Sequence, residues 1–478
     1  MSLSEAPLAE LVSTDPCTGD VLWRGPMAGI TDVGAALEAA RAAQPAWALL
    51  PDDARDTVAR RFAALARADR EPLAALIARE TGKPLWEART EVDSVAAKVD
   101  IAIAVRDARA GSRSSEAAGI TSALAHKPHG VLAVLGPYNF PMHLANGHIV
   151  PALIAGNAVV FKPSELTPAC GLAMVDLWRR AGLPDGLMGV VTGGAETGRL
   201  LSSHPDIDGL LFTGSATTGR LLARQFAETP HKMLALEMGG NAPLVVWDVA
   251  DLDAAAHVIA QSAYLSAGQR CTCARRLILP AGAAGNAVLE ALVAVVDRLI
   301  VGAPFDEPPP FMGPVIDVQA ASRLCAAEDA LMARGGRAIR RLALPGRPLP
   351  FLAPALIDVT HVADRPDEEH FGPLLQVVHV TDFAAALDEA NATRFGLAAG
   401  LISDDEALWR RFWATSRAGV VNWNRPTTGA SSALPFGGVG DSGNHRPSAA
   451  YAADYCAWPV ASLTQPVAQA PITTGLRP

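Results

Sequence analysis

The sequence predicts an α/β protein with two doubly wound parallel-sheet domains. Three observations predict this class. A glycine-poor helical region comes first, short β-rich runs alternate with helical stretches from Gly130 onward, and a second such series follows Glu237–Asn241. Strand, helix and strand in succession need crossover connections, which are right-handed and give parallel sheets.

The region from Asp32 to about Ala110 is rich in Ala, Arg, Glu and Leu. This composition predicts several consecutive helices. Because proline cannot continue a helix interior, we expect breaks near Pro51, Pro72 and Pro84.

The first αβ series consists of five short apolar runs with helices such as Cys170–Arg180 and Thr217–Phe226 between them. The predicted strands are Val131–Leu135, Ala158–Phe161, Gly189–Val191, Gly209–Phe212 and Met233–Glu237.

The second series has predicted strands at Pro243–Trp247, Leu277–Leu279, Leu374–Val380, Ala398–Ile402 and Gly419–Asn422, and helices at Asp253–Ser266 and Ala287–Leu299. The segment from about Asp454 fits neither sheet, so we expect an arm that packs on a partner subunit. Pro466–Pro478 is expected to be a loose tail.

Composition and charge exclude several classes of protein. Of the 478 residues, 50% are hydrophobic and 19% are charged, which is typical of a globular chain. The net charge of −9 argues against nucleic acid as a main partner, because phosphate backbones attract basic surfaces. No apolar run has the length of a membrane span, and Met1–Ala28 lacks the features of a signal peptide. We therefore expect a cytoplasmic protein.

Cysteine usage predicts reduced thiols and no metal site. The six cysteines are scattered along the chain rather than grouped as a disulfide framework. Cys271 and Cys273 are close in sequence, but no further His or Cys follows at a zinc spacing.

A cofactor site is predicted where the segment Phe212–Ser215 joins a strand to a helix. Gly214, Ser215 and Gly219 lie at this junction. Free N–H groups and the helix dipole at a helix N-terminus favour a phosphate. The spacing differs from the Gly-x-Gly-x-x-Gly fingerprint, so a plain turn that needs small residues is the alternative interpretation.

A second cofactor motif, Lys162-Pro163-Ser164-Glu165, ends a predicted strand, where ligands gather in α/β sheets. Lys162 and Glu165 are candidates for gripping the ribose hydroxyls of adenosine. Because a carboxylate repels a 2′-phosphate, the motif favours NAD over NADP. The alternative is an exposed Lys–Glu pair on a loop.

Three residues form a candidate catalytic set. Cys271 follows Gly268, Gln269 and Arg270 at a turn and is the candidate nucleophile. Glu237 ends an apolar strand before two glycines and is the candidate general base. The alternatives are a buried inert cysteine and a surface glutamate at a strand end.

Asn139 completes the set, because its turn is stiffened by Pro137 and Pro141 and a stiff amide suits an oxyanion hole. The alternative is a turn asparagine that bonds its own backbone.

Positive charge near Cys271 is expected to lower the pKa of its thiol. The candidate sources in the sequence are Arg270, Arg275 and Arg276. An oxidised nicotinamide would act in the same direction.

Seven ordered motifs together resemble the aldehyde dehydrogenase superfamily, along almost the whole chain. They are Tyr138-Asn139-Phe140-Pro141, Lys162-Pro163-Ser164-Glu165, Phe212-Thr213-Gly214-Ser215, Glu237-Met238-Gly239-Gly240, Gly268-Gln269-Arg270-Cys271, Glu369-His370-Phe371-Gly372-Pro373 and Pro435-Phe436-Gly437-Gly438.

The resemblance implies roles for residues of these motifs. Cys271 would attack the aldehyde, the Asn139 amide and the Cys271 N–H would hold the oxyanion, and Glu237 would activate the water that releases the acid. Lys162 and Glu165 would hold the adenosine ribose and Ser215 the pyrophosphate. Glu369 would bind the nicotinamide ribose, and Phe371 would pack beside the nicotinamide. Relatives that transfer the acyl group to coenzyme A lack the glutamate base, so Glu237 favours hydrolysis.

The resemblance also implies a domain plan and an assembly. An NAD-binding domain would cover residues 1–110 and 128–236, and a catalytic domain residues 237–440. Residues 111–127 and 441–478 would form an oligomerisation arm and a C-terminal tail, in a homodimer or homotetramer.

Two motifs depart from the commonest family pattern. Asn241 follows the glycines of the first motif, where a lysine is usual, and the second motif continues after Gly437 and Gly438 as Val439-Gly440-Asp441-Ser442-Gly443-Asn444, without the usual lysine. These departures resemble one branch of the superfamily, whose members oxidise a long acidic semialdehyde in arginine catabolism. Asp441 in the second motif has no explanation from the sequence.

An acidic substrate needs donors for its carboxylates, ideally arginine forks. Each candidate has a structural or surface role as its alternative. The candidates are Arg270, Arg425, His445, Arg446 and the backbone of Gly429-Ala430-Ser431, with Trp86 and Tyr138 as possible lining residues. Two further hypotheses stay open: another acidic semialdehyde, such as glutamate or succinate semialdehyde, as substrate, and a non-catalytic member of the family.

Overall fold

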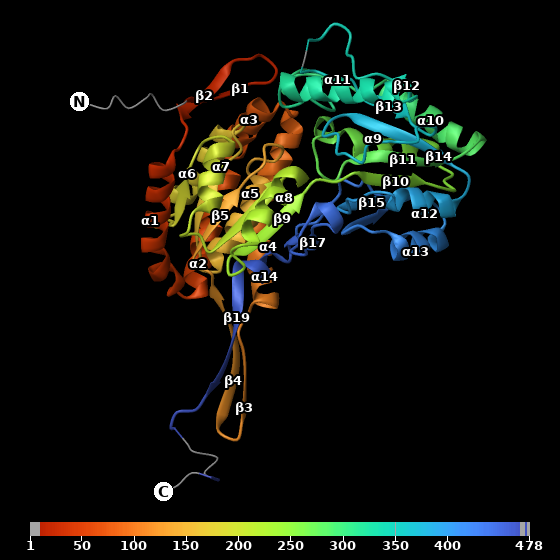
Figure 1. Cartoon of the computed structure of the whole chain (residues 1–478). Coiled ribbons are helices and arrows are strands. Elements are labelled where there is room, and N and C mark those ends of the chain that lie inside the picture. Colours follow the sequence, from red (N-terminus) through yellow and green to blue (C-terminus); the bar gives the residue numbers. More distant parts are fainter. Residues whose placement is uncertain (1–9, 349, 469–473, 476–478) are drawn as a thin grey trace.

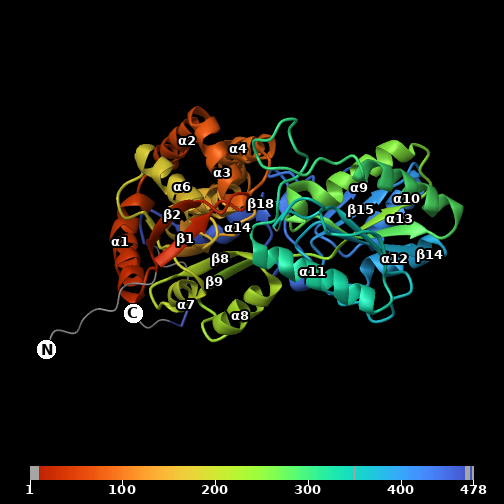
Figure 2. The same cartoon turned by 90° about the horizontal axis from the view of Figure 1, so that it is seen from above.

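Two open sheets of mainly parallel strands form the body of the protein, and a narrow three-stranded sheet projects from it (Figure 1). The computed structural model describes residues 10–348, 350–468 and 474–475. Seen from above, the two halves of the body lie side by side, with α1, α6, α7 and α8 in one and α9–α13 in the other (Figure 2). The predicted α/β class is confirmed.

The sheet of the first half has five parallel strands in the order β7-β6-β5-β8-β9. Its strands are β5 (Val131–Leu135), β6 (Ala158–Lys162), β7 (Met188–Val190), β8 (Gly209–Gly214) and β9 (Met233–Met238), joined by α5 (His143–Ile154), α6 (Pro168–Arg180), α7 (Ala195–Ser203) and α8 (Ala216–Phe226). All five predicted strands are present. The chain order reverses between β5 and β8, and such a switch point opens a crevice at the carboxyl ends of the strands.

Four helices precede this sheet: α1 (Ile30–Ala48), α2 (Asp52–Ala68), α3 (Arg70–Thr81) and α4 (Leu85–Arg109). The expected breaks near Pro51 and Pro84 are confirmed, but the break near Pro72 is wrong. The chain breaks at Asp69, and Pro72 lies in the first turn of α3. A proline is tolerated there because first-turn N–H groups have no intrahelical acceptor.

The sheet of the second half has seven strands in the order β12-β13-β14-β11-β10-β15-β16, and only β12 is antiparallel to its neighbour. The strands are β10 (Ala242–Val246), β11 (Ala274–Pro280), β12 (Arg337–Arg340), β13 (Ala355–Asp358), β14 (Leu374–Val380), β15 (Ala398–Ile402) and β16 (Val420–Trp423). The helices are α9 (Leu252–Tyr264), α10 (Ala283–Val296), α11 (Val318–Ala333), α12 (Phe383–Asn391) and α13 (Glu406–Thr415). Central strands such as β10 and β15 are buried along their whole length, as expected for a sheet covered on both faces.

The projecting sheet has the order β19-β4-β3, with β3 (Arg113–Ala117), β4 (Ile120–Pro128) and β19 (Ala457–Thr464). Strand β19 pairs antiparallel with β4 from Ala457 opposite Pro128 to Thr464 opposite Thr121. In Figure 1 this sheet extends well away from the body. The C-terminal segment therefore finds its place in a third sheet. Of the expected loose tail, residues 469–473 and 476–478 lie outside the described residues.

The remaining short elements lie in the body: β1 (Glu10–Thr14), β2 (Val21–Pro26), β17 (Pro435–Phe436), β18 (Ser448–Ala449) and α14 (Ala452–Cys456). In the first half, α14 packs against α4 and α5 and buries Tyr455 and Cys456. Across the described ranges, no helix combines the length and apolar character that a bilayer span requires.

Strand β9 is an edge strand of the first sheet, and a late segment covers its open edge. Asn444 donates from Nδ2 to the Leu234 carbonyl at 2.9 Å and accepts the Leu236 N–H at Oδ1, also at 2.9 Å. Next to it, Gly443 forms an antiparallel bridge with Glu237. The Asn444 side chain thus takes the place of a neighbouring strand and gives hydrogen-bond partners to two backbone groups at the edge of β9.

We expect Asn444→Ala to lower the free energy of unfolding by about 1–3 kcal/mol, because Leu234 and Leu236 each lose a hydrogen-bond partner. Urea denaturation followed by circular dichroism measures the change. Asn286→Ala, at an exposed helical position without a side-chain hydrogen bond, is the matched control and should leave stability nearly unchanged. Equal stability of the two variants would contradict this role for Asn444.

Candidate active site

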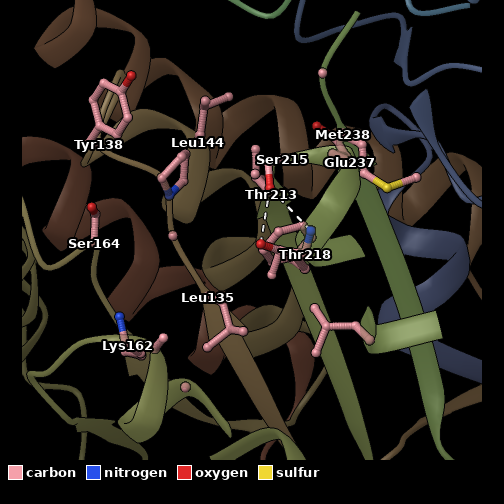
Figure 3. Close-up of a pocket in the computed structure, with 18 of the residues that line it drawn as sticks. Leu135, Tyr138, Leu144, Lys162, Ser164, Thr213, Ser215, Thr218, Glu237 and Met238 are labelled. Atoms are coloured by element: carbon pink, nitrogen blue, oxygen red, sulfur yellow. Dashed lines mark hydrogen bonds between the residues drawn. The ribbon is translucent and has the colours of Figure 1, made fainter. Parts of the chain in front are cut away.

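A cavity of about 730 Å³ lies between the two halves, at the carboxyl ends of β5, β6, β8 and β9. Figure 3 shows Lys162 and Ser164 on one side of it and Ser215 and Thr218 on another. Residues of the second half close it. Of the residues predicted for the site, those that line the cavity are Asn139, Lys162, Glu165, Gly214, Ser215, Glu237, Cys271, Glu369 and Phe371.

Ser215 marks the start of α8 at this cavity. Its hydroxyl caps the helix by accepting the Thr218 N–H at 3.2 Å, and it also contacts the Thr218 hydroxyl at 3.0 Å (Figure 3). The first turn of α8 carries no acidic residue. Free N–H groups and the helix dipole therefore face the cavity, which suits a phosphate.

Gly219 acts one turn further along α8. It does not line the cavity, but a Cβ at this position would lie 2.1 Å from the sulfur of Met238. Glycine therefore lets α8 pack closely against the end of β9, and this packing fixes where Ser215 and Glu237 stand relative to each other.

Lys162 ends β6 with its side chain mostly buried. Its Nζ lies 3.4 Å from Glu165 Oε2 and donates to the Pro163 carbonyl at 3.1 Å. Burial lowers the pKa of Lys162, and Glu165 opposes that shift. The pair lines the cavity together with Ser164, so it is not simply a surface ion pair.

The beginning of α7 also lines the cavity, through Gly194 and Ala195. The strand before this turn is predicted from the sequence, but the turn itself has no predicted role. The two adjacent glycines, Gly193 and Gly194, between a strand and a helix were the available signal. The cavity therefore receives two helix N-termini, those of α7 and α8.

Glu369 reaches the cavity from the second half. Its Oε1 accepts the Gly240 N–H at 3.1 Å, and a Cβ on Gly239 would lie 1.7 Å from its Oε2. Gly239 is thus needed for the carboxyl group to approach the backbone. Burial raises the pKa of Glu369 to about 7.

Phe371 stands beside Tyr138, with ring centroids 6.0 Å apart in an edge-to-face arrangement. The Arg275 guanidinium lies 5.5 Å from the Phe371 ring. Because both rings line the cavity, they give it an apolar wall of fixed orientation.

Cys271 is delivered to the cavity by a strained turn. The 3₁₀ turn Leu265–Gly268 contains left-handed φ values at Ser266 (55°), Ala267 (53°) and Gly268 (72°). A Cβ at Gly268 would lie 2.1 Å from the Gly372 carbonyl oxygen, so only glycine fits. Left-handed non-glycine residues are unfavourable and concentrate at functional sites.

The expectation of a lowered thiol pKa is wrong for this cavity. Burial raises the pKa of Cys271, and Glu369 and Glu237 raise it further. Two of the three expected cations are neutralised by partners, because Arg270 pairs with Glu87 at 2.7 Å and Arg276 with Glu389 at 3.3 Å. Arg275, the third expected cation, does lower the pKa of Cys271, but burial outweighs it.

Asn139 lies against the same loop. It is 8% exposed, and its Nδ2 donates to the carbonyl of Gln269 at 2.9 Å. The predicted oxyanion amide and the cysteine loop are thus in direct contact, although they are far apart in sequence. An amide nitrogen carries two N–H donors, so this bond leaves one for a ligand.

Glu237 ends β9 deep in the site, 4% exposed, and it is paired with Thr213 of β8 across the sheet. Burial raises its pKa to about 7, while the Ser448 N–H, which donates to Oε1 at 3.1 Å, and the Lys98 charge oppose the shift. A carboxyl with this pKa can accept a proton near neutral pH.

The substrate candidates do not line the cavity. Arg270 is committed to buried Glu87, whereas Arg425, His445 and Arg446 are exposed. The segment Gly429–Ser431 is exposed as well, and the Asn422 amide holds the Gly429 carbonyl at 3.0 Å. Tyr138 lines the cavity and Trp86 does not.

The unusual motif residues have structural roles that the sequence did not reveal. Asn241 donates to Asp367 at 2.8 Å. Asp441 joins Arg220 of α8 at 3.1 Å and Arg394 at 2.9 Å. Asp441 thereby ties α8 to the second half.

Comparison with known proteins agrees with this geometry. Residues 4–458 match the model of the aldehyde dehydrogenase family. An N-succinylglutamate 5-semialdehyde dehydrogenase of Caulobacter vibrioides is 62% identical over 98% of this chain and 99% of its own length. A protein of the same name from Sphingopyxis alaskensis is 58% identical over 98% and 97%. Among solved structures, an E. coli NADP-dependent enzyme superposes with a TM-score of 0.89 at 32% identity, covering 96% of this chain and 95% of that one. The chain belongs to the aldehyde dehydrogenase family and is an aldehyde-oxidising enzyme.

Proposed function

We propose that this enzyme oxidises N-succinyl-L-glutamate 5-semialdehyde to N-succinyl-L-glutamate with NAD, in arginine degradation. The observation that carries the proposal is the 62% identity, over nearly the full length of both chains, to a dehydrogenase named for this aldehyde. The cavity lined by Cys271, Glu237 and Asn139 supports the chemistry.

Cys271 is the proposed nucleophile, and it adds to the aldehyde carbon to form a thiohemiacetal. Its raised pKa means that a proton must leave the thiol during attack, and Glu237, with a pKa of about 7, is a suitable acceptor. The remaining N–H of the Asn139 amide and the Cys271 backbone N–H are the proposed donors to the oxyanion.

Glu237 has a second proposed task. After hydride loss the acyl group is held on Cys271 as a thioester, and Glu237 releases to solvent the proton that it took from the thiol. The ionised Glu237 then takes a proton from the water that attacks the thioester carbon. The carbon–sulfur bond breaks, the carboxylic acid leaves, and Glu237 returns its proton to the Cys271 sulfur, which restores the thiol. Aldehyde, water and the oxidised dinucleotide thus give acid, the reduced dinucleotide and a proton.

A dinucleotide fits the residues around the cavity, and when bound it supplies the hydride acceptor. Lys162 and Glu165 are proposed to hold the adenosine ribose, and Ser215 at the start of α8 the pyrophosphate. Glu369 is proposed to hold the nicotinamide ribose, with Phe371 beside the ring. The carboxylate of Glu165, 48% exposed at its side chain, supports NAD over NADP because it would repel a 2′-phosphate.

The substrate carboxylates need cations that are not already paired. Arg425 and His445 have no ion pair within the described ranges, whereas Arg270 is paired with Glu87. We therefore propose Arg425, His445 and the exposed backbone of Gly429, Ala430 and Ser431 as substrate contacts.

The domain plan and assembly are proposed as well. Residues 1–110 and 128–236 would bind NAD, and residues 237–440 would carry Cys271. The sheet β19-β4-β3 is the proposed contact in a homodimer or homotetramer, because it projects from the body with exposed Leu124 and Leu463.

The substrate is tested by kcat/KM over a panel of aldehydes with NAD and with NADP. We expect the highest value with N-succinylglutamate 5-semialdehyde and NAD, and lower values with glutamate and succinate semialdehydes, which lack the succinylamide. A better rate with either shorter compound would overturn the substrate assignment. A folded protein that oxidises none of them would overturn catalysis.

The roles of Cys271 and Glu237 are tested by rapid mixing. Cys271→Ala should give no burst of reduced cofactor and retain NAD binding. Glu237→Gln should give a full burst, one equivalent per site, and a steady-state rate lowered by about 100-fold or more, because the thioester accumulates. Glu228→Gln is the matched control and should behave as the wild type, because Glu228 is exposed and has no ion pair with any residue that the structure describes. Normal turnover of Glu237→Gln would contradict the assignment.

The pH dependence of thioester hydrolysis should report the raised pKa of Glu237. Only the ionised carboxylate can accept a proton, so we expect the rate to fall about tenfold per unit below pH 7 and to level off above it. Single-turnover release of the acid measures this step. If the rate in Glu237→Gln fell below pH 7 as steeply as in the wild type, another group would be responsible for the pH dependence.

A further inference from the structure

The start of α4 carries buried charges that the proposed chemistry does not use. Lys83, just before the helix, is 4% exposed, and Glu87 and Glu91 within it are 0% and 1% exposed. None of the three lines the cavity. Burying ions is costly unless they are paired and hydrogen-bonded, so their partners indicate what they hold in place.

Lys83 and Glu91 hold the turn that carries Asn139. Lys83 Nζ donates to Glu91 Oε2 at 2.8 Å and to the Asn139 carbonyl at 2.7 Å. Glu91 Oε1 accepts the N–H groups of Met142 at 3.0 Å and His143 at 3.2 Å, at the start of α5. The turn is thus fixed on both sides of Phe140.

Glu87, one helical turn earlier, holds the other half of the site. Its Oε1 accepts from Arg270 Nη2 at 2.7 Å and from the Ser266 hydroxyl, and Arg270 Nε donates to Ser266 Oγ at 2.9 Å. Ser266 is the first left-handed residue of the strained turn, and Arg270 lies between that turn and Cys271. The i, i+4 spacing directs Glu87 and Glu91 to the same face of α4.

The contacts of Lys83 and Glu91 and the contacts of Glu87 meet at Phe140, and together they are called the clamp. Lys83 Nζ lies 3.8 Å from the centroid of this ring, and the Arg270 guanidinium lies 5.0 Å from it. The hydrogen bond from Asn139 Nδ2 to the Gln269 carbonyl joins the Asn139 turn directly to the Cys271 loop. One helix end therefore fixes both segments that must supply oxyanion donors, Asn139 and the Cys271 backbone.

We propose that Lys83, Glu87 and Glu91 are positioning residues that set the distance between the Asn139 amide and the Cys271 loop. This rests on the proposed oxyanion role of Asn139. An oxyanion hole works only if its donors are held in place beforehand, and displacements of about 1 Å cost about 100-fold in rate. In this arrangement Arg270 serves the loop geometry rather than a substrate carboxylate.

Lys83→Met tests the clamp in the full-length enzyme. The substitution removes the Lys83 Nζ donor from the Asn139 carbonyl and leaves Cys271 and the residues proposed to bind the cofactor unchanged. We expect the rate constant of the hydride burst to fall by about 10–100-fold. The amplitude of the burst, divided by the number of Cys271 thiols that can be alkylated, should stay at one per site. The Kd for NAD should not change. A purely structural role would instead reduce amplitude and alkylation together and leave the rate constant of the remaining sites unchanged.

Lys232→Met is the matched control, because Lys232 also donates to backbone carbonyls, those of His204 at 2.8 Å and Pro205 at 3.0 Å, away from the cavity. It should keep the wild-type burst rate constant. A wild-type burst rate constant in Lys83→Met, or loss of amplitude alone, would overturn the clamp.

If Lys83→Met does not fold, Glu91→Gln gives the same test with an isosteric side chain. Its control is Glu80→Gln, since Glu80 is equally buried and caps the start of α6 through Ala169 and Cys170 at 2.9 and 2.8 Å. We expect the burst rate constant to fall several-fold only in Glu91→Gln, and equal rate constants would overturn the proposal. The burst is measured with an aldehyde of the panel that the wild type oxidises. A wrong substrate assignment is therefore seen in the panel and does not affect this test. A wild type that oxidises none of the aldehydes overturns both the proposed function and the positioning role.

Discussion

The left-handed turn Ser266–Gly268 is the constraint on which the site depends. The chain leaving α9 must reverse within a few residues to bring Cys271 beneath the cavity, and only a residue without Cβ can pass the Gly372 carbonyl at Gly268. Left-handed Ser266 and Ala267 cost about 1–3 kcal/mol each. Buried contacts offset that strain, among them the Gln269 amide, whose oxygen accepts the Ile316 N–H at 3.0 Å. Cys271 is thus held in place by tertiary contacts, not by local preference.

The electrostatics of the cavity follow from the same burial. Cys271, Glu237 and Glu369 are all acids whose pKa is raised by desolvation. Ionisation of Glu237 or of Glu369 raises the pKa of Cys271 further. With pKa values of about 7, both glutamates are near half ionisation at neutral pH. The charge of the cavity therefore changes with pH around neutrality.

Local patterns were sufficient for the five strands of the first sheet and for five strands of the second, but not for β12 and β13. Continuous apolar runs such as Val131–Leu135 and Leu374–Val380 are the buried strands, with the predicted bounds. The turns after strands were predictable because the carboxyl ends of parallel strands meet at one edge. Partners from distant segments were not predictable. The pKa of Cys271 was misjudged because burial raises it, and because Glu87 and Glu389, far away in sequence, bind Arg270 and Arg276. Asn444 and Asp441 act on β9 and α8 in the same long-range way.

The first half of the body is discontinuous in sequence, and this affects how the protein folds during synthesis. Its edge strand β9 is closed by Asn444, its core contains Tyr455, and β4 pairs with β19. These residues leave the ribosome after the whole second half has been made. An emerging chain therefore has an unpaired edge and an incomplete core until its end is released, and such surfaces are where aggregation begins and where chaperones bind.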